Sequence, residues 1–449
     1  MTAPLGQHEP ATAVLGLGRT GLAVARYLAR RGVPFRVLDS RAAPPGLETL
    51  RRELPEVETV LGPFTPDRLC AAETLILSPG IAPDEPAVAA AAAAGVEVVG
   101  DIELFAREAT APVVAVTGSN GKSTVTALVG AMAEKAGKRV AVGGNIGTPA
   151  LDLLSGPAPE LYVLELSSFQ LETTASLDAA AAAVLNVSAD HLDRHPDLAA
   201  YAAIKRRVFH GRGTMVVNAD DPAVAAMAEA GRPVVRFTLA DPAAGEYGLR
   251  EVDGAPWLAR GGEPLLPLAA LALAGGHNAA NALAALALGE AVGLPMPAML
   301  EALRTFPGLP HRCQYVAEHG GVRWYNDSKG TNVGATEAAL RGVPGERVVL
   351  IAGGEGKDAD FAVLRAAVAE RARAVVVIGR DAPLLVAALH ATVPIEKAPD
   401  MDAAVAAAAR LAEPGDSVLL SPACASFDMF RDYAARGEAF VAAVGRLPA

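Results

Sequence analysis

The chain has 449 residues, a length that favours two to four domains at roughly 100 to 200 residues per domain. Its 39 Lys and Arg stand against 50 Asp and Glu, a net charge of −11 without any basic block, which excludes a surface built to follow nucleic-acid phosphates. Hydrophobic residues make up 51%, but many are alanines, and the longest apolar stretch, residues 265–274, is about half of the roughly twenty residues that span a bilayer. Three scattered cysteines and an N-terminus without a basic, apolar leader lead us to expect a cytoplasmic protein that is not inserted in a membrane.

Short apolar runs rich in Val, Leu and Ile alternate along the chain with longer, alanine-rich helical patterns. The runs are residues 13–18, 35–39, 74–80, 113–118, 161–167, 214–221, 347–354, 374–379 and 417–422. Such alternation is typical of βα units on parallel sheets that are buried on both faces. It predicts an α/β fold made of mainly parallel sheets flanked by helices.

The spacing of these runs predicts three domains, 1–100, 101–308 and 309–449. Residues 96–108 connect the first group to a new predicted strand that begins near Pro112. Residues 305–312 contain Pro and Gly residues typical of a linker. Segment 241–270 is rich in Gly and Pro and alternates weakly. We predict a small antiparallel excursion there, within the middle domain.

The first glycine loop follows a predicted strand and opens a helix. Gly16, Gly18 and Gly21 form a G-x-G-x-x-G pattern, and Asp39 ends the next strand. This spacing suits a nucleotide whose phosphates meet the helix N-terminus while Asp39 lies near a sugar or base. The pattern alone leaves open a dinucleotide, another nucleotide or a structural tight turn.

The second glycine loop, residues 117–124, also lies between a strand and a helix. Backbone N–H groups between Gly118 and Gly121 can cradle phosphates, Lys122 can neutralise them, and the Ser123 hydroxyl can bind magnesium. The loop is shorter than the usual phosphate-binding loop. The coincidence of strand, glycines, lysine, hydroxyl and helix nevertheless predicts a nucleoside triphosphate site.

Two further residues are candidates for holding metal ions. Glu165 ends a strongly apolar strand, where phosphate-loop proteins commonly place a metal-binding acid. His191 lies in a polar segment and can bind a metal as neutral imidazole. The alternatives are a buried ion pair for Glu165 and a solvated ring for His191.

Longer motifs resemble the bacterial peptidoglycan Mur ligases over the whole chain and in the same order. They are TGSNGKST at 117–124, ELSSFQLE at 165–172, DHLDRH at 190–195, YAAIK at 201–205, GGHNAAN at 275–281, LPHR at 309–312, NDSKGTN at 326–332 and SPACASFD at 421–428. The resemblance implies a Rossmann-like first domain, a P-loop ATPase-type central domain and a Rossmann-like third domain. It also implies an ATP-dependent amide ligase that adds D-glutamate to UDP-N-acetylmuramoyl-L-alanine through an acyl phosphate.

The resemblance assigns the substrates to particular positions. The UDP-sugar would be held by Gly16, Leu17, Gly18, Arg19, Thr20, Gly21, Asp39, Ser40, Ser78, Gly80 and Asn145. ATP would be bound by Gly118, Ser119, Asn120, Gly121, Lys122, Ser123, Thr124, Asn281, Arg312 and Asp327. D-Glutamate would be bound by Lys329, Thr331, Lys357, Ser426 and Tyr433, although the family pattern leads us to expect phenylalanine at the last position.

The resemblance further implies two Mg²⁺ ions and names Lys122, His191 and Lys205 as catalytic. Ser123, Glu165, His191 and Lys205 would lie at the metals, with Lys205 converted by CO₂ to a carbamate. A carbamate supplies the anionic oxygen that magnesium prefers and an amine lacks. Without the resemblance, an ordinary surface lysine beside Arg206 and Arg207 would be the simpler interpretation.

Three other functions fit parts of the same sequence. A sister Mur ligase or a folate-polyglutamate ligase would share the central domain but add another amino acid. A NAD-dependent oxidoreductase would use Gly16 to Gly21 and Asp39, and a phosphate-loop switch would hydrolyse ATP without any amino acid.

Overall fold

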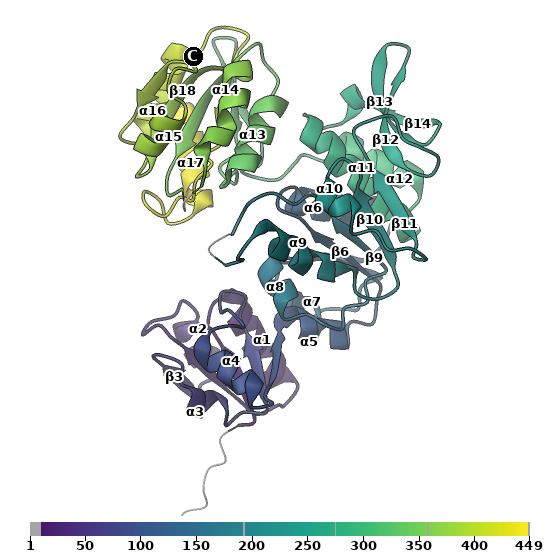
Figure 1. Ribbon diagram of the computed structural model, residues 1–449, viewed down its shortest axis with the longest axis vertical. Helices are drawn as coiled ribbons and strands as arrows, with labels where there is room; N and C mark the ends of the chain where they lie inside the picture. Colours follow the sequence, from purple (N-terminus) through teal and green to yellow (C-terminus); the bar gives the residue numbers. More distant parts are fainter. Residues whose placement is uncertain (1–9, 192–193, 274, 357–358, 448–449) are drawn as a thin grey trace, which may run out of the picture.

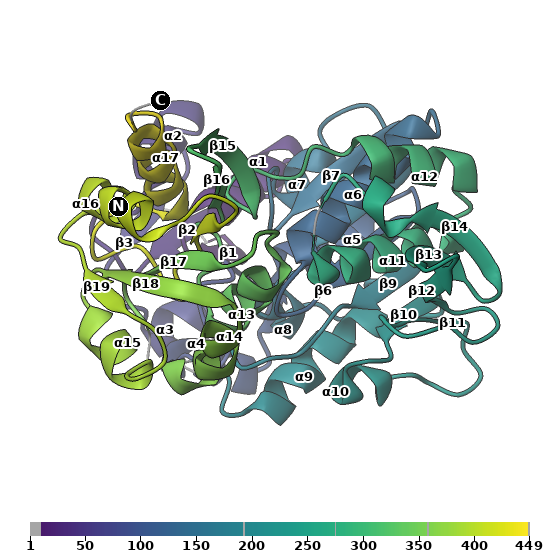
Figure 2. The same cartoon turned by 90° about the horizontal axis from the view of Figure 1, so that it is seen from above.

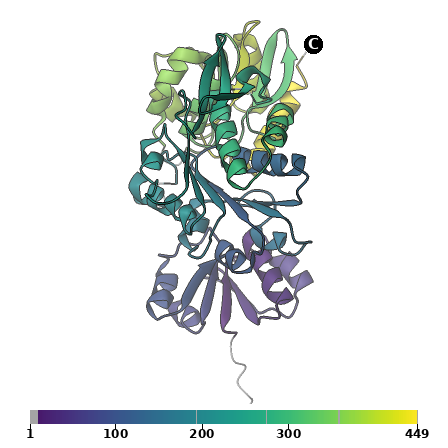
Figure 3. The same cartoon turned by 90° about the vertical axis from the view of Figure 1, so that its right-hand side faces the viewer.

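The computed structural model describes residues 10–191, 194–273, 275–356 and 359–447. Strands in these ranges form three separate sheets, which follow one another along the long axis of the molecule in sequence order (Figures 1 and 3). Helices flank each sheet. This architecture confirms the predicted fold class.

The first sheet is fully parallel, with the strand order β3-β2-β1-β4-β5. Its strands are β1 (Thr12–Leu15), β2 (Phe35–Asp39), β3 (Thr59–Leu61), β4 (Thr74–Leu77) and β5 (Glu97–Gly100). Its helices are α1 (Arg19–Arg30), α2 (Leu47–Glu53), α3 (Pro66–Leu69) and α4 (Pro86–Ala93). Every residue of β2 is buried, because apolar clusters cover both faces of the sheet.

The central sheet has the order β14-β13-β12-β11-β10-β9-β6-β8-β7. Its strands are β6 (Val113–Thr117), β7 (Val140–Gly144), β8 (Leu161–Glu165), β9 (Ala181–Val184), β10 (Thr214–Asn218), β11 (Val234–Phe237), β12 (Tyr247–Val252), β13 (Ala255–Arg260) and β14 (Glu263–Pro267). Strands β6 to β11 are parallel, and β12, β13 and β14 pair antiparallel at one edge. The antiparallel excursion predicted for 241–270 is therefore confirmed, and it extends the central sheet itself.

Eight α-helices of the described chain accompany this sheet. They are α5 (Asp101–Glu108), α6 (Lys122–Lys135), α7 (Ala150–Leu153), α8 (Ser168–Glu172), α9 (Leu198–Arg206), α10 (Pro222–Ala225), α11 (Gly276–Ala291) and α12 (Met296–Thr305), with 3-10 turns at Arg207–Phe209 and Leu268–Ala270. The alanine-rich α11 is buried along most of its length, because small side chains let it lie close to α6 and to the sheet.

The third sheet has the order β15-β16-β20-β17-β18-β19, parallel except for the antiparallel edge strand β15. Its strands are β15 (Gln314–His319), β16 (Val322–Asn326), β17 (Val348–Gly353), β18 (Ala372–Ile378), β19 (Ile395–Lys397) and β20 (Ser417–Leu420). The helices are α13 (Val333–Gly342), α14 (Arg365–Arg371), α15 (Ala382–Ala388), α16 (Met401–Leu411) and α17 (Tyr433–Val444), with a 3-10 turn at Phe361–Leu364. The sequence predicted only β17, β18 and β20, the three strands with uninterrupted apolar runs.

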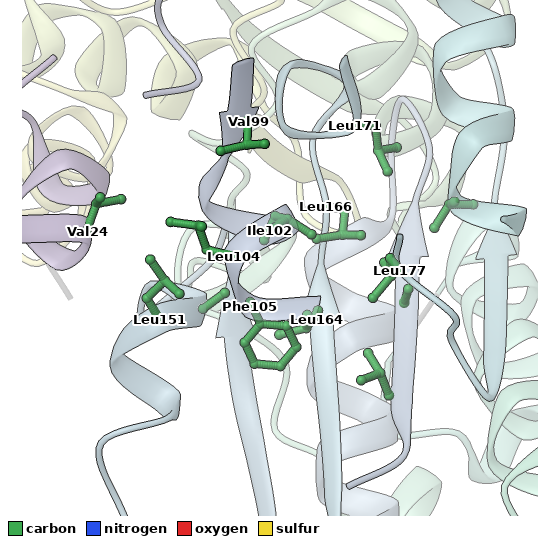
Figure 4. Close-up of a cluster of buried hydrophobic side chains, with 14 of the residues drawn as sticks. Val24, Val99, Ile102, Leu104, Phe105, Leu151, Leu164, Leu166, Leu171 and Leu177 are labelled. Carbon is green, nitrogen blue, oxygen red and sulfur yellow. The ribbon is translucent and has the colours of Figure 1, made fainter. Parts of the chain in front are cut away.

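Helix α5 joins the first sheet to the central one. It follows β5 directly, yet it buries Ile102, Leu104 and Phe105 in one apolar cluster shared with Val24 of α1 and Leu164 of β8 (Figure 4). The ring of Phe105 meets that of Tyr162 edge-on, at 5.0 Å between centroids. The first and central sheets therefore share a continuous hydrophobic core.

We predict that two glycines of the first loop differ sharply in their tolerance of a side chain. A Cβ at Gly21 would lie 1.8 Å from the carbonyl oxygen of Gly16, whereas a Cβ at Gly18 would meet nothing within 4 Å. Gly21→Ala must push α1 away from the loop and should lower the free energy of unfolding by about 1–3 kcal/mol. Gly18→Ala is the matched control, and urea unfolding of both variants is the measurement. Equal stability of the two variants would contradict the close packing described.

Candidate active site

The phosphate-type loop joins β6 to α6 at the carboxyl edge of the central sheet. Gly118 and Gly121 adopt φ of +150° and +85°, which only glycine takes without strain. A Cβ at Gly121 would lie 2.4 Å from Oδ1 of Asn281 on α11. The second glycine thus brings Asn281 against the loop.

Two lysine amines donate to the same carbonyl oxygen of this loop. Lys122 Nζ lies 2.8 Å from the Gly118 oxygen and 2.9 Å from that of Ser119, and Lys205 Nζ lies 2.9 Å from the Gly118 oxygen. Burial lowers the pKa of Lys122, and Arg312 adds to the effect while Glu165 and Asp190 oppose it.

Lys205 is the more deeply buried of the two, with 1% of its surface exposed. Its Nζ lies 4.1 Å from the centroid of the Tyr201 ring, one turn earlier on α9. Burial, and then the positive charge of Lys122, hold the pKa of Lys205 well below the usual lysine value. The amine therefore loses its proton more readily than that of an exposed lysine.

Beside these amines lies a short chain of hydrogen bonds centred on Glu165. The Ser123 hydroxyl donates to one carboxylate oxygen, and Asn145 Nδ2 donates to the other at 2.7 Å. Glu165 is 3% exposed. A hydroxyl and a carboxylate in contact at the start of α6 are the oxygen donors that suit Mg²⁺.

His191 lies in the loop that follows β9 and has a positive φ of 55°. Its Nε2 is 3.8 Å from Oδ2 of Asp190, and its ring packs edge-on against Phe169 at 4.9 Å between centroids. The described residues contain no cluster of three or more His, Cys, Asp or Glu side chains placed to hold a metal. Any metal here would thus depend on hydroxyl, phosphate or modified-lysine oxygens as well.

The third sheet supplies the opposite wall of the site. Arg312 Nη2 donates to the Ser123 hydroxyl at 2.6 Å, so a guanidinium from the third sheet reaches the phosphate loop. Asp327 accepts from the Cys313 N–H at 3.2 Å and the Ser421 hydroxyl at 2.7 Å, and burial raises its pKa to about 6.

Lys329 lies on the same wall, and its amine is enclosed by aromatic and basic neighbours. Its Nζ is 4.0 Å from the centroid of the Tyr433 ring. Burial, and to a smaller degree Arg312, lower its pKa to about 8. The tyrosine at position 433, where the family pattern predicts phenylalanine, thus packs by its ring face against this lysine.

Two cavities bring most of the predicted residues of the central and third sheets together. A cavity of about 520 Å³ is lined by Arg19, Ser119, Asn120, Gly121, Lys122, Ser123, Asn145, Glu165, His191, Lys205, Arg312, Lys329, Thr331 and Tyr433, among others. A second cavity of about 380 Å³ is lined by Asn120, Gly121, Thr124, Asn281, Arg312, Asp327 and Lys329, among others. Helix α13 of the third sheet lies beside α11 where these walls meet (Figure 2).

Most of the predicted residues of the first sheet line neither cavity. They are Gly16, Leu17, Gly18, Thr20, Gly21, Asp39, Ser40, Ser78 and Gly80. Arg19 alone of this group reaches the larger cavity, where it donates to the Gly147 carbonyl. The Asp39 carboxylate is turned inward, accepting from the Leu17 N–H at 2.7 Å and from Arg41, and these bonds lower its pKa against the opposing effect of burial.

Two predicted residues of the third sheet are not placed in the cavities. Ser426 is buried at 3% exposure and lines neither one. Lys357 lies outside the described residues.

Several lining residues were not among the predicted site residues. Ser168 and Phe169 begin α8 and face the larger cavity, as does Asn332 of the third sheet. Asn186 holds Asn120 by a bond at 2.8 Å to its N–H and one at 3.0 Å to its carbonyl. Asn186 and Asn332 both stand inside or beside recognised motifs, but the motifs did not indicate which atoms they would bind.

The fold and the site together define a nucleotide-dependent enzyme built from three α/β units, with the phosphate loop on the second and basic side chains facing it from the third. Family models match in the same order: the "Mur ligase MurD-like, N-terminal domain" at residues 10–100, the "Mur ligase middle domain" at 116–289 and the "Mur ligase, glutamate ligase domain" at 311–424. The chain belongs to the Mur ligase family. This membership decides against the oxidoreductase and switch alternatives.

Similar proteins extend over nearly the whole chain. One, 59% identical over 443 residues and covering 98% of each chain, is the UDP-N-acetylmuramoylalanine–D-glutamate ligase of Nitrosococcus oceani. The ligase of the same name from Pseudomonas putida is 55% identical and covers 97% of each chain. Among solved structures, UDP-N-acetylmuramate-alanine ligase from Thermotoga maritima is similar with a TM-score of 0.62 at 20% identity, covering 97% of this chain and 99% of that one. FolC of E. coli in complex with ADP has a TM-score of 0.58 at 20% identity, covering 77% and 92%, and at such identities the likeness concerns the fold alone.

No described helix combines the length and the apolar character needed to cross a bilayer.

We predict that Lys205→Met makes the protein more stable. The pKa of the Lys205 amine is lower in the folded than in the unfolded protein. Between these two pKa values the unfolded chain binds more protons, so the stability of the wild type rises with pH in that range. Methionine removes the free-energy cost of burying the amine and should raise the free energy of unfolding by about 1 kcal/mol or more at neutral pH. The gain should shrink as the pH approaches the unfolded value of 10.5.

The measurement is urea unfolding at several pH values in buffer stripped of CO₂. Exposed Lys135 on α6 provides the control, Lys135→Met. A gain at Lys205 that does not depend on pH would contradict the depressed pKa.

Proposed function

We propose that this chain is an ATP-dependent ligase that adds D-glutamate to UDP-N-acetylmuramoyl-L-alanine during cytoplasmic peptidoglycan precursor synthesis. The observation that carries the proposal is the match, over nearly the full length of both chains, to ligases named for this reaction. The site supports it, because a phosphate loop faces cationic and hydroxyl side chains across one cavity. Such a cavity can hold a nucleotide and a dicarboxylic amino acid side by side.

The reaction requires activation of a carboxylate, which is a poor acylating agent at neutral pH. The L-alanyl carboxylate attacks the γ-phosphate of ATP, giving an acyl phosphate and ADP. The amine of D-glutamate then adds to the acyl carbon, and the tetrahedral intermediate expels phosphate. Lys122 and Arg312 would neutralise the phosphoryl oxygens from opposite walls, so catalysis would be mainly positioning and charge stabilisation.

We place ATP between the central and third sheets. The phosphates would meet the loop Gly118–Thr124 and Arg312, and the remainder of the nucleotide would occupy the smaller cavity beside Asn281 and Asp327. The UDP part of the other substrate would bind the first glycine loop, with Arg19 and Asn145 nearest the reacting end.

We place D-glutamate on the third-sheet wall. Lys329, Thr331 and Tyr433 line the cavity that also contains Lys122. A lysine and a hydroxyl can receive carboxylates by charge-assisted hydrogen bonds. Lys357 and Ser426 remain proposed D-glutamate ligands by resemblance.

Two Mg²⁺ ions complete the proposed site. Ser123 and Glu165 would hold the first, and His191 with a carbamate on Lys205 would hold the second. The ions supply charge neutralisation for the phosphates. The residues fit this role chemically, because the oxygens of Ser123 and Glu165 lie in hydrogen-bond contact and the pKa of the Lys205 amine is lowered.

We further propose that the first, central and third domains span 1–100, 101–308 and 309–449. These ranges contain the first, the central and the third sheet, respectively.

The substrate assignment predicts phosphate release that depends on D-glutamate. Purified protein with MgATP and UDP-N-acetylmuramoyl-L-alanine should release phosphate only when D-glutamate is added. L-Glutamate and D-glutamine should be poor substrates, because each leaves a charge-assisted bond unmade at a cost of about 1.5–3 kcal/mol, roughly ten- to a hundredfold in rate. Dependence on another amino acid would identify a sister ligase, and release without any amino acid would contradict ligation.

The carbamate assignment predicts that Lys205→Ala loses most activity and regains part of it when a short carboxylic acid is added. The acid supplies the missing anion. Lys205→Arg should be as damaging as Lys205→Ala, because arginine stays cationic and cannot take up CO₂. Initial rates with and without added acetate are the measurement, and near-normal turnover by Lys205→Arg would rule out the carbamate.

A further inference from the structure

Both polar atoms of the Asn332 side chain form hydrogen bonds, and its nitrogen connects the third domain to the phosphate loop. It is the N-cap of α13, where its Oδ1 accepts from the Ala335 N–H at 2.8 Å. Its Nδ2 donates to Oδ1 of Asn120 at 3.2 Å and to Oδ2 of Asp190 at 3.1 Å. One amide thus starts a helix of the third domain and donates twice to the central domain.

Both acceptors belong to segments that carry proposed catalytic groups. Asn120 lies in the phosphate loop, directly before Gly121 and Lys122, and Asn186 holds its backbone on both sides. Asp190 precedes His191 and accepts from the His191 N–H at 3.0 Å through its other oxygen. A displacement of Asn332 would therefore shift both the phosphate loop and His191.

The surface around Asn332 is closely fitted but is not held by a shared core. A Cβ on Gly334 would lie 3.4 Å from Oγ of Ser188 and 3.6 Å from Nδ2 of Asn120, so the first turn of α13 rests on the central domain. The buried residues of the apolar clusters around the third sheet all lie between positions 322 and 444, within the third domain. Polar contacts such as those of Asn332 must set how the two domains meet at the site.

Asn332 also fixes a segment that carries proposed substrate ligands. Lys329 and Thr331 precede it by three residues and one residue, and both line the same cavity. A contact that holds Asn332 to the phosphate loop therefore sets the distance between the proposed D-glutamate ligands, Lys329 and Thr331, and the proposed position of the ATP phosphates.

We propose that Asn332 is a positioning residue that locks the third domain onto the phosphate loop and orients the Asp190–His191 turn for the reaction. The kinetic part of this role rests on the proposed ligase function, and the closure part does not. The amide does not touch the reacting atoms. It acts through Asn120 and Asp190.

The first test is Asn332→Asp. Aspartate is as good an N-cap as asparagine, so α13 should keep its start and the melting temperature should change little. The new carboxylate faces that of Asp190 at the place where the Asn332 amide donated a hydrogen bond. The two like charges repel each other. The turnover number should fall at least tenfold, while the Michaelis constant for D-glutamate rises, in a protein that remains folded.

The second test restores the pair in reverse. In Asp190→Asn combined with Asn332→Asp, the donor and the acceptor exchange places, and Asn120 can turn its own amide to offer N–H. The double variant should recover at least threefold over Asn332→Asp. The matched control is Asp400→Asn, a cap exchange at the exposed start of α16, which should leave activity unchanged. No recovery in the double variant, or equal loss in the control, overturns the proposal.

Closure is measured without the amino acid, so it stands apart from the ligase chemistry. Small-angle scattering of the wild type with MgADP should show a compact particle, and Asn332→Asp should give a larger radius of gyration under the same conditions. Identical profiles with wild-type kinetics overturn the positioning role. A wild type that compacts with MgADP but releases no phosphate with D-glutamate would instead contradict the proposed function and leave the closure result in force.

Discussion

The rest of the site depends on one crowded acceptor, the carbonyl oxygen of Gly118. Two amines, those of Lys122 and Lys205, donate to it, and burial lowers the pKa of both. Protonating both amines in a buried site is costly, and an anion beside them would offset that cost. The phosphate oxygens that we propose to bind at this loop would supply that negative charge.

The geometry that creates this crowding begins with backbone conformations. The positive φ angles of Gly118 and Gly121 turn the chain so tightly that loop carbonyls and the start of α6 face the same cavity. Lys205 then arrives from α9, a different element altogether, packed against the ring of Tyr201. The lowered pKa of this lysine therefore depends in part on the tertiary arrangement, because the charge of Lys122, distant in sequence, adds to the effect of burial.

This distinction explains how far the sequence could be interpreted. Apolar runs predicted β17, β18 and β20, because interior parallel strands are buried on both faces, but the three-residue β19 and the half-exposed β15 lack that signature. The glycine, lysine and hydroxyl spacing predicted the phosphate loop, because its chemistry lies in consecutive residues.

Predictions about side-chain direction were less complete. The position of Asp39 suggested a sugar contact, yet its carboxylate turns inward to the Leu17 N–H. Asn332 stood inside a recognised motif, but its two acceptors come from positions 120 and 190, and pairings of that range depend on how separate domains meet. Local spacing contains no information about them.

The shared core around α5 makes the contact between the first and central domains different in kind from the contact between the central and third domains. The first and central domains share a buried apolar cluster that includes Val24 and Phe105, whereas the third meets the central domain through polar groups near the site. Apolar contacts of the first kind must be exposed to water for the parts to separate, but polar contacts can exchange with water or ligand at little net cost. The first two domains are thus aligned with each other when the chain folds. The entropy lost in aligning them is lost on folding, whereas separating the third domain from the central one would expose mainly polar groups.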